Sequence, residues 1–175
     1  MNVHMIEDII KCRDSLSYFI EKYCGIELSV GQREFIKRLE SSGRIETFLS
    51  EEERTPIMIC LYAHEVVFKT NVTLCISAFN VTRAQLHLEK VRKMIARLPD
   101  HLRPIIEINN KRELKYDNRN LVIVRSMKPI SFRGMGINII WIDALYSSLK
   151  TLKELEEFLL PVVSSGRGQK YIVTY

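Results

Sequence analysis

The sequence predicts an α/β fold: a mainly parallel central sheet with helices on both faces. Short apolar runs alternate along the chain with longer segments of helical periodicity. Several of the runs, Val72 to Ser77 and Ile137 to Ile142 among them, are apolar on both faces, which is typical of strands covered from both sides. The length of 175 residues, with 46% hydrophobic and 27% charged residues, fits a single globular domain.

The chain is expected to begin with a helical lead-in over residues 1–42, followed by an α/β core over 43–175. Residues 3–24 carry apolar side chains at helical spacing, with a restart of the helix at positions 14–15. Residues 30–40 repeat the helical pattern before a serine- and glycine-containing stop.

The core begins with an apolar run, Ile45 to Leu49, that is expected to be a strand. Thr55 as N-cap and Pro56 at the first helical position then predict an almost wholly apolar helix that ends near Phe68. The remaining expectations are strands over 72–77, 105–108, 113–116, 121–124, 137–142 and 171–174, and helices over 81–98 and 152–160.

Composition excludes some classes of protein. No apolar run approaches the roughly 20 residues needed to cross a bilayer, and the N-terminus carries acids where a signal peptide carries bases. The four cysteines form no C-x-x-C pair, which argues against zinc and redox motifs. His64 and His87 lie in helical patterns and are expected to have structural roles. The net charge of +5 permits contact with nucleic acid without requiring it.

The segment from Asn138 to Ala144 is the first candidate site, because it places one carboxylate, Asp143, at the end of a buried strand. Nucleotide-driven motors place a Mg²⁺-holding Asp and a water-activating Glu side by side at such a strand end. Ala144 cannot transfer a proton, and the loss of a general base costs about 10²–10⁴-fold in rate. The alternative is that Asp143 caps the following turn.

The segment 50–55 is the second candidate, because it lies between a strand and a buried helix, where a phosphate-binding loop would be. It is expected to meet Asp143 to Ser147 and Thr174-Tyr175 at the carboxyl edge of the sheet. A phosphate loop needs glycines, a lysine and a Ser or Thr, but the chain has three glutamates here and no glycine from 44 to 133. Each repulsion of a triphosphate costs roughly 1–4 kcal/mol at about 4 Å. The alternative is an acidic, solvated loop.

Three basic residues outside these segments are candidates for contact with nucleic acid or a protein partner. Arg133 precedes the Asp143 strand, whereas Arg167 and Lys170 belong to a glycine-containing basic loop before the last strand. The basic face of the helix over 83–97 is a further candidate. The alternatives are structural ion pairs, a plain connector and a solvated helix face.

These motifs resemble the N-terminal ATPase region of the large terminase, the DNA-packaging motor of tailed phages, particularly the large contractile-tailed branch. The similarity extends over nearly the whole chain in order and spacing. The matching stretches are Cys12-Arg13-Asp14, Tyr18-Phe19, Tyr23-Cys24, Gln32-Arg33, Leu61-Tyr62-Ala63-His64, Arg97-Leu98-Pro99-Asp100 with Leu102 and Pro104, Glu113-Leu114, Arg133-Gly134, Ile140-Trp141-Ile142-Asp143, Pro161-Val162-Val163-Ser164-Ser165-Gly166-Arg167 and Ile172-Val173-Thr174.

The resemblance implies a P-loop NTPase-like core in which four residues would bind nucleotide if any nucleotide binds. Gln32 matches the glutamine that reads adenine, and Asp143 matches the Mg²⁺ carboxylate, the single metal position. Arg54 and Thr55 fall where the family has Lys-Thr.

Three other positions depart from the family pattern. Glu53 falls on the obligatory glycine, Ser50 on an early arginine of the loop and Ala144 on the catalytic glutamate. The second ATPase subdomain and the nuclease domain that follow in the family are not expected in this chain.

The sequence therefore predicts a truncated, catalytically inactive terminase-ATPase-like phage protein that acts by binding, as a regulator or accessory of viral DNA packaging. Its expected partners are the large or small terminase, the portal, or DNA, with no cofactor and no membrane, in the cytoplasm of the infected bacterial host. One alternative is a conditionally active ATPase that uses Mg-ATP and is completed by a partner chain. The other is a nucleic-acid-binding regulator.

Overall fold

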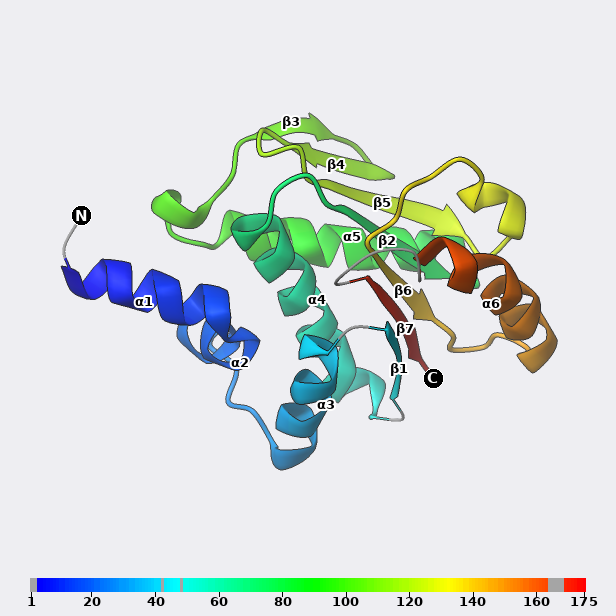
Figure 1. Cartoon of the computed structure of the whole chain (residues 1–175), viewed down its shortest axis with the longest axis horizontal. Coiled ribbons are helices and arrows are strands. Elements are labelled where there is room, and N and C mark those ends of the chain that lie inside the picture. The colour runs from blue at the N-terminus through cyan, green and yellow to red at the C-terminus, as the bar shows by residue number, and fades with distance from the viewer. Residues whose placement is uncertain (1–2, 42, 48, 164–168) are drawn as a thin grey trace.

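A computed structural model describes residues 3–41, 43–47, 49–163 and 169–175 (Figure 1). The helices are α1 (Val3–Asp14), α2 (Leu16–Phe19), α3 (Val30–Glu40), α4 (Glu51–Phe68), α5 (Val81–Ala96) and α6 (Leu149–Val163). The strands are β1 (Gly43–Thr47), β2 (Thr73–Ala78), β3 (Ile106–Asn109), β4 (Glu113–Tyr116), β5 (Leu121–Ser126), β6 (Ile139–Asp143) and β7 (Lys170–Thr174). A π-helical turn covers Ile20–Cys24, and short 3-10 turns cover Asp100–Leu102 and Pro129–Phe132.

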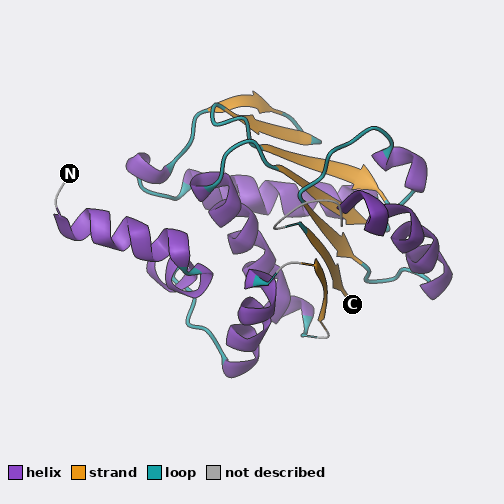
Figure 2. Ribbon diagram, viewed as in Figure 1, coloured by secondary structure: helices purple, strands orange, loops and turns teal. Residues whose placement is uncertain are grey.

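The strands form one mixed sheet in the order β1-β7-β6-β2-β5-β4-β3 (Figure 2). The five strands from β1 to β5 in this order are parallel, and β4 and β3 continue the sheet as an antiparallel hairpin. The first strand, β1, pairs with the last, β7, from Gly43 opposite Lys170 to Thr47 opposite Thr174. The predicted fold class, a mainly parallel sheet, is confirmed.

Both faces of the sheet are covered, as the strands that are apolar on both faces require. One face carries Leu74, Ile76 and Trp141, which pack with buried side chains of α4 and α5. The opposite face carries Cys75 and Ile140, which pack with α6. Within the part of the chain that the structure describes, no helix is long and apolar enough to span a bilayer.

Helices α2 and α3 pack against α4, and α1 packs on α2 (Figure 1). The chain breaks at Ser15, whose hydroxyl accepts a hydrogen bond from the amide of Tyr18 and restarts the helix, as the sequence predicts. Burial lowers the pKa of His64 to about 4, so its ring is neutral. His64 Nε2 lies 2.8 Å from the carbonyl oxygen of Cys12 and ties α4 to the end of α1. The structural role expected for His64 is confirmed.

The start of α4 differs from the sequence prediction. Thr55 and Pro56 do not begin the helix, which has its N-cap at Ser50 and its first helical residue at Glu51, five residues earlier than predicted. The reason is a capping box: the Ser50 hydroxyl accepts from the Glu53 amide at 3.3 Å, and the Glu53 carboxylate accepts from the Ser50 amide at 3.1 Å. Two satisfied backbone donors outweigh the Thr-Pro signal, and Pro56 lies inside the helix.

Asn120 joins the end of α4 to the start of β2. Its side chain is fully buried. The amide oxygen of Asn120 accepts from the Val72 amide at 2.9 Å, and its nitrogen donates to the carbonyls of Val66 and Lys69, each at 2.8 Å. The side chain therefore satisfies three backbone groups at a connection between a helix and a strand.

We expect Asn120→Ala to lower the free energy of unfolding by roughly 1–3 kcal/mol, because it leaves the Val72 amide without its partner and removes one of two side-chain donors from the carbonyls of Val66 and Lys69, which keep Asn118. Urea denaturation followed by circular dichroism measures the loss. Asn109→Ala, on the exposed strand β3, is the control and should change the free energy by less than about 0.5 kcal/mol. Equal effects of the two substitutions would contradict this role of Asn120.

Candidate functional site

The carboxyl ends of the parallel strands form a row across one edge of the sheet. Thr47 lies opposite Thr174, which lies opposite Asp143; Asp143 in turn lies opposite Ala78. The Ala144 amide donates to the Thr174 carbonyl at 2.8 Å. The strand ends that the sequence predicts to meet therefore do meet, at the edge where ligands bind in folds of this kind.

Asp143 is the charged centre of this edge, with a side chain only 2% exposed. One of its oxygens, Oδ2, accepts from Arg83 Nε at 2.5 Å and lies 2.7 Å from His87 Nε2. The other, Oδ1, accepts a long bond of 3.4 Å from the Leu145 amide. The carboxylate therefore both caps the following turn and binds two side chains of α5.

The positions of Arg83 and His87 follow from helix geometry. They are four residues apart on α5, so both face the strand end. Behind them, the His87 ring lies 4.4 Å from the Trp141 ring, centroid to centroid. Trp141 Nε1 in turn donates to Thr174 Oγ1 at 3.0 Å. The site therefore rests on a buried, hydrogen-bonded layer.

Hydrogen bonds from His87 and Arg83 keep the Asp143 carboxylate charged. Burial raises the pKa of Asp143, but hydrogen bonds from His87 and Arg83 outweigh burial and hold the pKa below its usual value. An ionised carboxylate only accepts hydrogen bonds, so His87 Nε2 carries the proton in its bond to Asp143. Burial lowers the pKa of Arg83, but Asp143 and Glu51 outweigh it and raise the pKa above its usual value.

The segment 50–55 is the N-cap and first turn of α4, not a loop, so this prediction was wrong. Its side chains extend the charge network, because Glu51 Oε1 lies 2.7 Å from Arg83 Nη2. Arg83 therefore lies between two carboxylates, those of Glu51 and Asp143. Glu53 is committed to the capping box with Ser50.

Arg54 is buried at the same edge and is 3% exposed. Its Nη1 donates to the Leu49 carbonyl at 2.7 Å, whereas its Nη2 has no hydrogen-bond partner among the residues described. Burial lowers the pKa of Arg54, and the negative charges of Asp143 and Glu51 oppose that effect. The guanidinium thus adds a second buried cation close to the carboxylates.

Gln32 lies in the first turn of α3, where both polar atoms of its side chain form hydrogen bonds. Its oxygen accepts from the Ser29 amide at 3.0 Å, and its nitrogen donates to the Glu53 carbonyl at 3.0 Å. Gln32 therefore ties the start of α3 to the first turn of α4. Thr55, the fourth candidate, is buried in the second turn of α4.

Within the described residues, neither Arg133 nor Lys170 forms a hydrogen bond or ion pair with this site. Arg133 is exposed just after a 3-10 turn. Lys170 is the first residue of β7 and is 8% exposed, at the amino end of the strand, so it does not belong to an exposed loop as expected. Arg167 lies outside the described residues.

The residues at the edge do not fit Mg-ATP, the cofactor that the resemblance implies. One Asp143 oxygen, Oδ2, is held by Arg83 and His87, and Ala144 supplies no base. The helix starts at Glu51 without a glycine-containing loop, so three carboxylates lie where phosphates would bind. Within the described ranges no cluster of three His, Cys, Asp or Glu side chains could hold a metal ion.

The binding of Asp143 by Arg83 and His87 was not predicted from the sequence. Arg83 was counted only as part of a basic helix face, and His87 was expected to have an ordinary structural role. The signal was present: both lie on one side of the helix that follows a strand ending beside Asp143, and an i, i+4 Arg-His pair there can face that edge.

No family model matches the chain. In structure it is similar to the ATPase domain of the large terminase of Thermus phage P74-26, with 16% identity and a TM-score of 0.64 over 89% of this chain and 67% of that one. It is also similar to the large terminase of bacteriophage HK97, with 13% identity and a TM-score of 0.72 over 93% of this chain. The chain spans 37% of the HK97 protein. The predicted structural resemblance is confirmed, and at this identity it concerns the fold alone.

The buried charge network predicts how the free energy of unfolding depends on pH. Asp143→Asn leaves Arg83 without its buried carboxylate, so we expect a loss of roughly 3 kcal/mol in the free energy of unfolding at neutral pH. Because the folded pKa of Asp143 is depressed below 3.8, its contribution is present above that pH and is lost as pH falls through the folded pKa. The difference between wild type and variant, measured by urea denaturation from about pH 7 to about pH 3, should therefore shrink.

The control is Asp100→Asn, because the Asp100 side chain is 96% exposed and pairs with Arg103 at the surface. It should leave the stability nearly unchanged at every pH. A loss in Asp143→Asn that stays constant down to about pH 3 would show that packing, not charge, accounts for the role of Asp143.

Proposed function

We propose that this chain is a non-hydrolysing protein with the terminase ATPase fold that acts by binding, as a regulator or accessory of viral DNA packaging. The proposal rests on one observation: Arg83 and His87 of the same chain bind the Asp143 carboxylate. Oδ2 is satisfied within the chain at 2.5–2.7 Å, so Mg²⁺ could bind through it only by breaking a buried network.

The start of α4 supports the same proposal. The first backbone amides of a helix bind phosphate when they are free. Here the Ser50 hydroxyl accepts from the Glu53 amide, and three glutamates surround the helix end. Two or three repulsive contacts, each of roughly 1–4 kcal/mol, offset much of the roughly 8 kcal/mol of a micromolar complex.

The proposed partners are components of a packaging machine: the large terminase, the small terminase, the portal, or DNA, in the cytoplasm of an infected bacterium. The support is the shared fold with the P74-26 and HK97 large terminases. A domain with the fold of a motor subunit, but without its chemistry, would act through the surfaces that it presents to other molecules.

A specific observation favours a second candidate, a conditionally active ATPase. Arg54 is buried with one guanidinium nitrogen unpartnered within the described residues, which suits an anion. A partner chain would have to supply the missing base and displace Arg83 from Asp143. Phosphate release that starts only when a large terminase, a small terminase or DNA is added would support this candidate over the first.

For the isolated chain, we expect isothermal titration with Mg-ATP to give no binding at about 1 mM, the concentration that corresponds to roughly 4 kcal/mol. A phosphate-release assay on the same sample should give no turnover. Micromolar binding together with turnover would disprove the proposal.

The variant Ala144→Glu tests whether the missing base alone prevents ATP hydrolysis, or whether the rest of the site prevents it as well. We expect this variant to remain inactive with Mg-ATP, because the Asp143 network and the glutamates of α4 are unchanged. The measurement is steady-state phosphate release, with Ala144→Gln as the control that adds similar volume without a base. If Ala144→Glu turned over and Ala144→Gln did not, the missing glutamate would be the only defect and the account of α4 would be wrong.

A further inference from the structure

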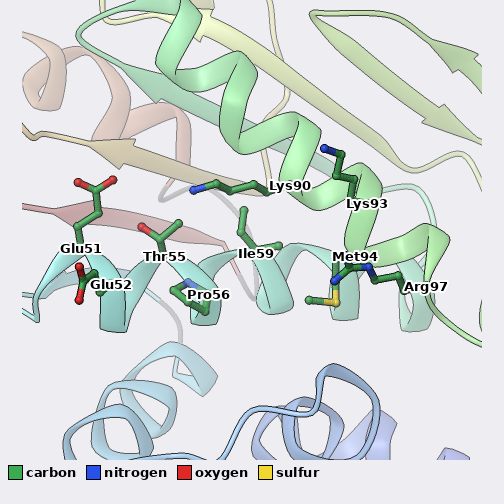
Figure 3. Close-up of a pocket in the computed structure, with 9 residues that line it drawn as sticks. All are labelled: Glu51, Glu52, Thr55, Pro56, Ile59, Lys90, Lys93, Met94 and Arg97. Carbon is green, nitrogen blue, oxygen red and sulfur yellow. The ribbon is translucent and has the colours of Figure 1, made fainter.

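A groove of about 670 Å³ runs between α4 and α5, beside the Asp143 site (Figure 3). Its floor is apolar: Pro56 and Ile59 come from α4, and Met94 comes from α5. Figure 3 shows Glu51 and Glu52 at one end of the groove and Met94 with Arg97 at the other. The volume is within the range of about 300–1,000 Å³ of ligand-binding clefts.

The α5 side of the groove is basic. Lys90, Lys93 and Arg97 recur at i, i+3 and i+7, so they lie along one side of the helix, and all three are exposed. Lys93 has a weak contact of 3.8 Å with Glu89. Lys90 and Arg97 form no ion pair with any residue that the structure describes. Two of the three cations are therefore available to acidic groups from outside the chain.

The α4 end of the groove accepts hydrogen bonds. Glu52 supplies a carboxylate, and so does Glu51, which also pairs with Arg83 at 2.7 Å. Pro56 has no N–H, so the carbonyl of Glu52, four residues earlier, lacks its usual helical donor. This end suits a cationic or N–H group of a ligand, and it repels phosphate.

We infer that the groove binds a peptide segment of a protein partner in which apolar residues are combined with acidic ones. The apolar residues would cover Pro56, Ile59 and Met94, and the acidic ones would pair with Lys90, Lys93 and Arg97. A nucleic-acid strand fits less well, because its phosphates would meet Glu51 and Glu52. The inference rests on the proposed function, because it assigns the surface and the chemistry of the partner through which a non-hydrolysing protein acts.

The test is a selection from a displayed library of random peptides of about fifteen residues on the purified full chain. The charge-reversed variant Lys90→Glu, Lys93→Glu, Arg97→Glu is selected in parallel. The control variant Lys37→Glu, Lys128→Glu, Lys153→Glu changes three exposed cations away from the groove and alters the net charge equally. Synthetic copies of enriched peptides, and DNA of matched length, are then measured by fluorescence polarisation.

Wild type and the control variant should enrich acidic peptides with apolar residues. The groove variant should bind these peptides at least about tenfold more weakly, the loss expected when three rim charges are reversed. Three outcomes would overturn the inference: no enrichment of acidic-apolar peptides, equal weakening in both variants, or DNA binding that exceeds peptide binding and depends on the groove cations.

A titration with Mg-ATP on the same three proteins separates this inference from the proposed function. Turnover of ATP with groove-dependent peptide binding intact would overturn the proposed function and leave the groove assignment standing. Absence of both ATP binding and peptide enrichment would overturn the groove assignment and leave the proposed function standing.

Discussion

The buried charge of Asp143 is the constraint on which this end of the molecule depends. An ionised carboxylate that is 2% exposed is tolerated only if it is paired and hydrogen-bonded. Arg83 and His87 meet that need and fix α5 against β6, while Glu51 extends the network to the first turn of α4. One buried carboxylate therefore orients two helices and a strand, and the same pairing occupies Oδ2, one of the two oxygens through which it could bind a metal ion.

The start of α4 shows how the same fold accommodates different chemistry. A phosphate-binding fold uses the first amides of this helix for its ligand. Here Ser50 and Glu53 satisfy part of that helix end with a capping box, and Gln32 binds the Glu53 carbonyl instead of a base. Several polar groups at this helix end are thus used for local stability, and the similarity to phage terminases is one of fold.

The sequence predicted the elements of the fold well and the site only in part. Strands such as β2 and β6 are apolar on both faces, and α5 is strongly periodic, so local patterns identify them. The predicted start of α4 is wrong because two local signals compete there, Ser50-Glu53 and Thr55-Pro56. The two hydrogen bonds between Ser50 and Glu53, which only the structure shows, decide between them. The partners of Asp143 lie about 60 residues away in sequence, and periodicity alone does not show which face of α5 meets which strand end.

The pairing of β1 with β7 has a consequence for how the chain reaches this structure. β1 leaves the ribosome early, yet its hydrogen-bonding neighbour is the last strand of the described chain. Such a contact costs much loop-closure entropy and forms late. Until β7 arrives, β1 has no neighbour in the sheet, and β6 exposes an unpaired edge of Ile and Trp residues. During synthesis the nascent chain therefore carries an aggregation-prone edge until β7 covers it.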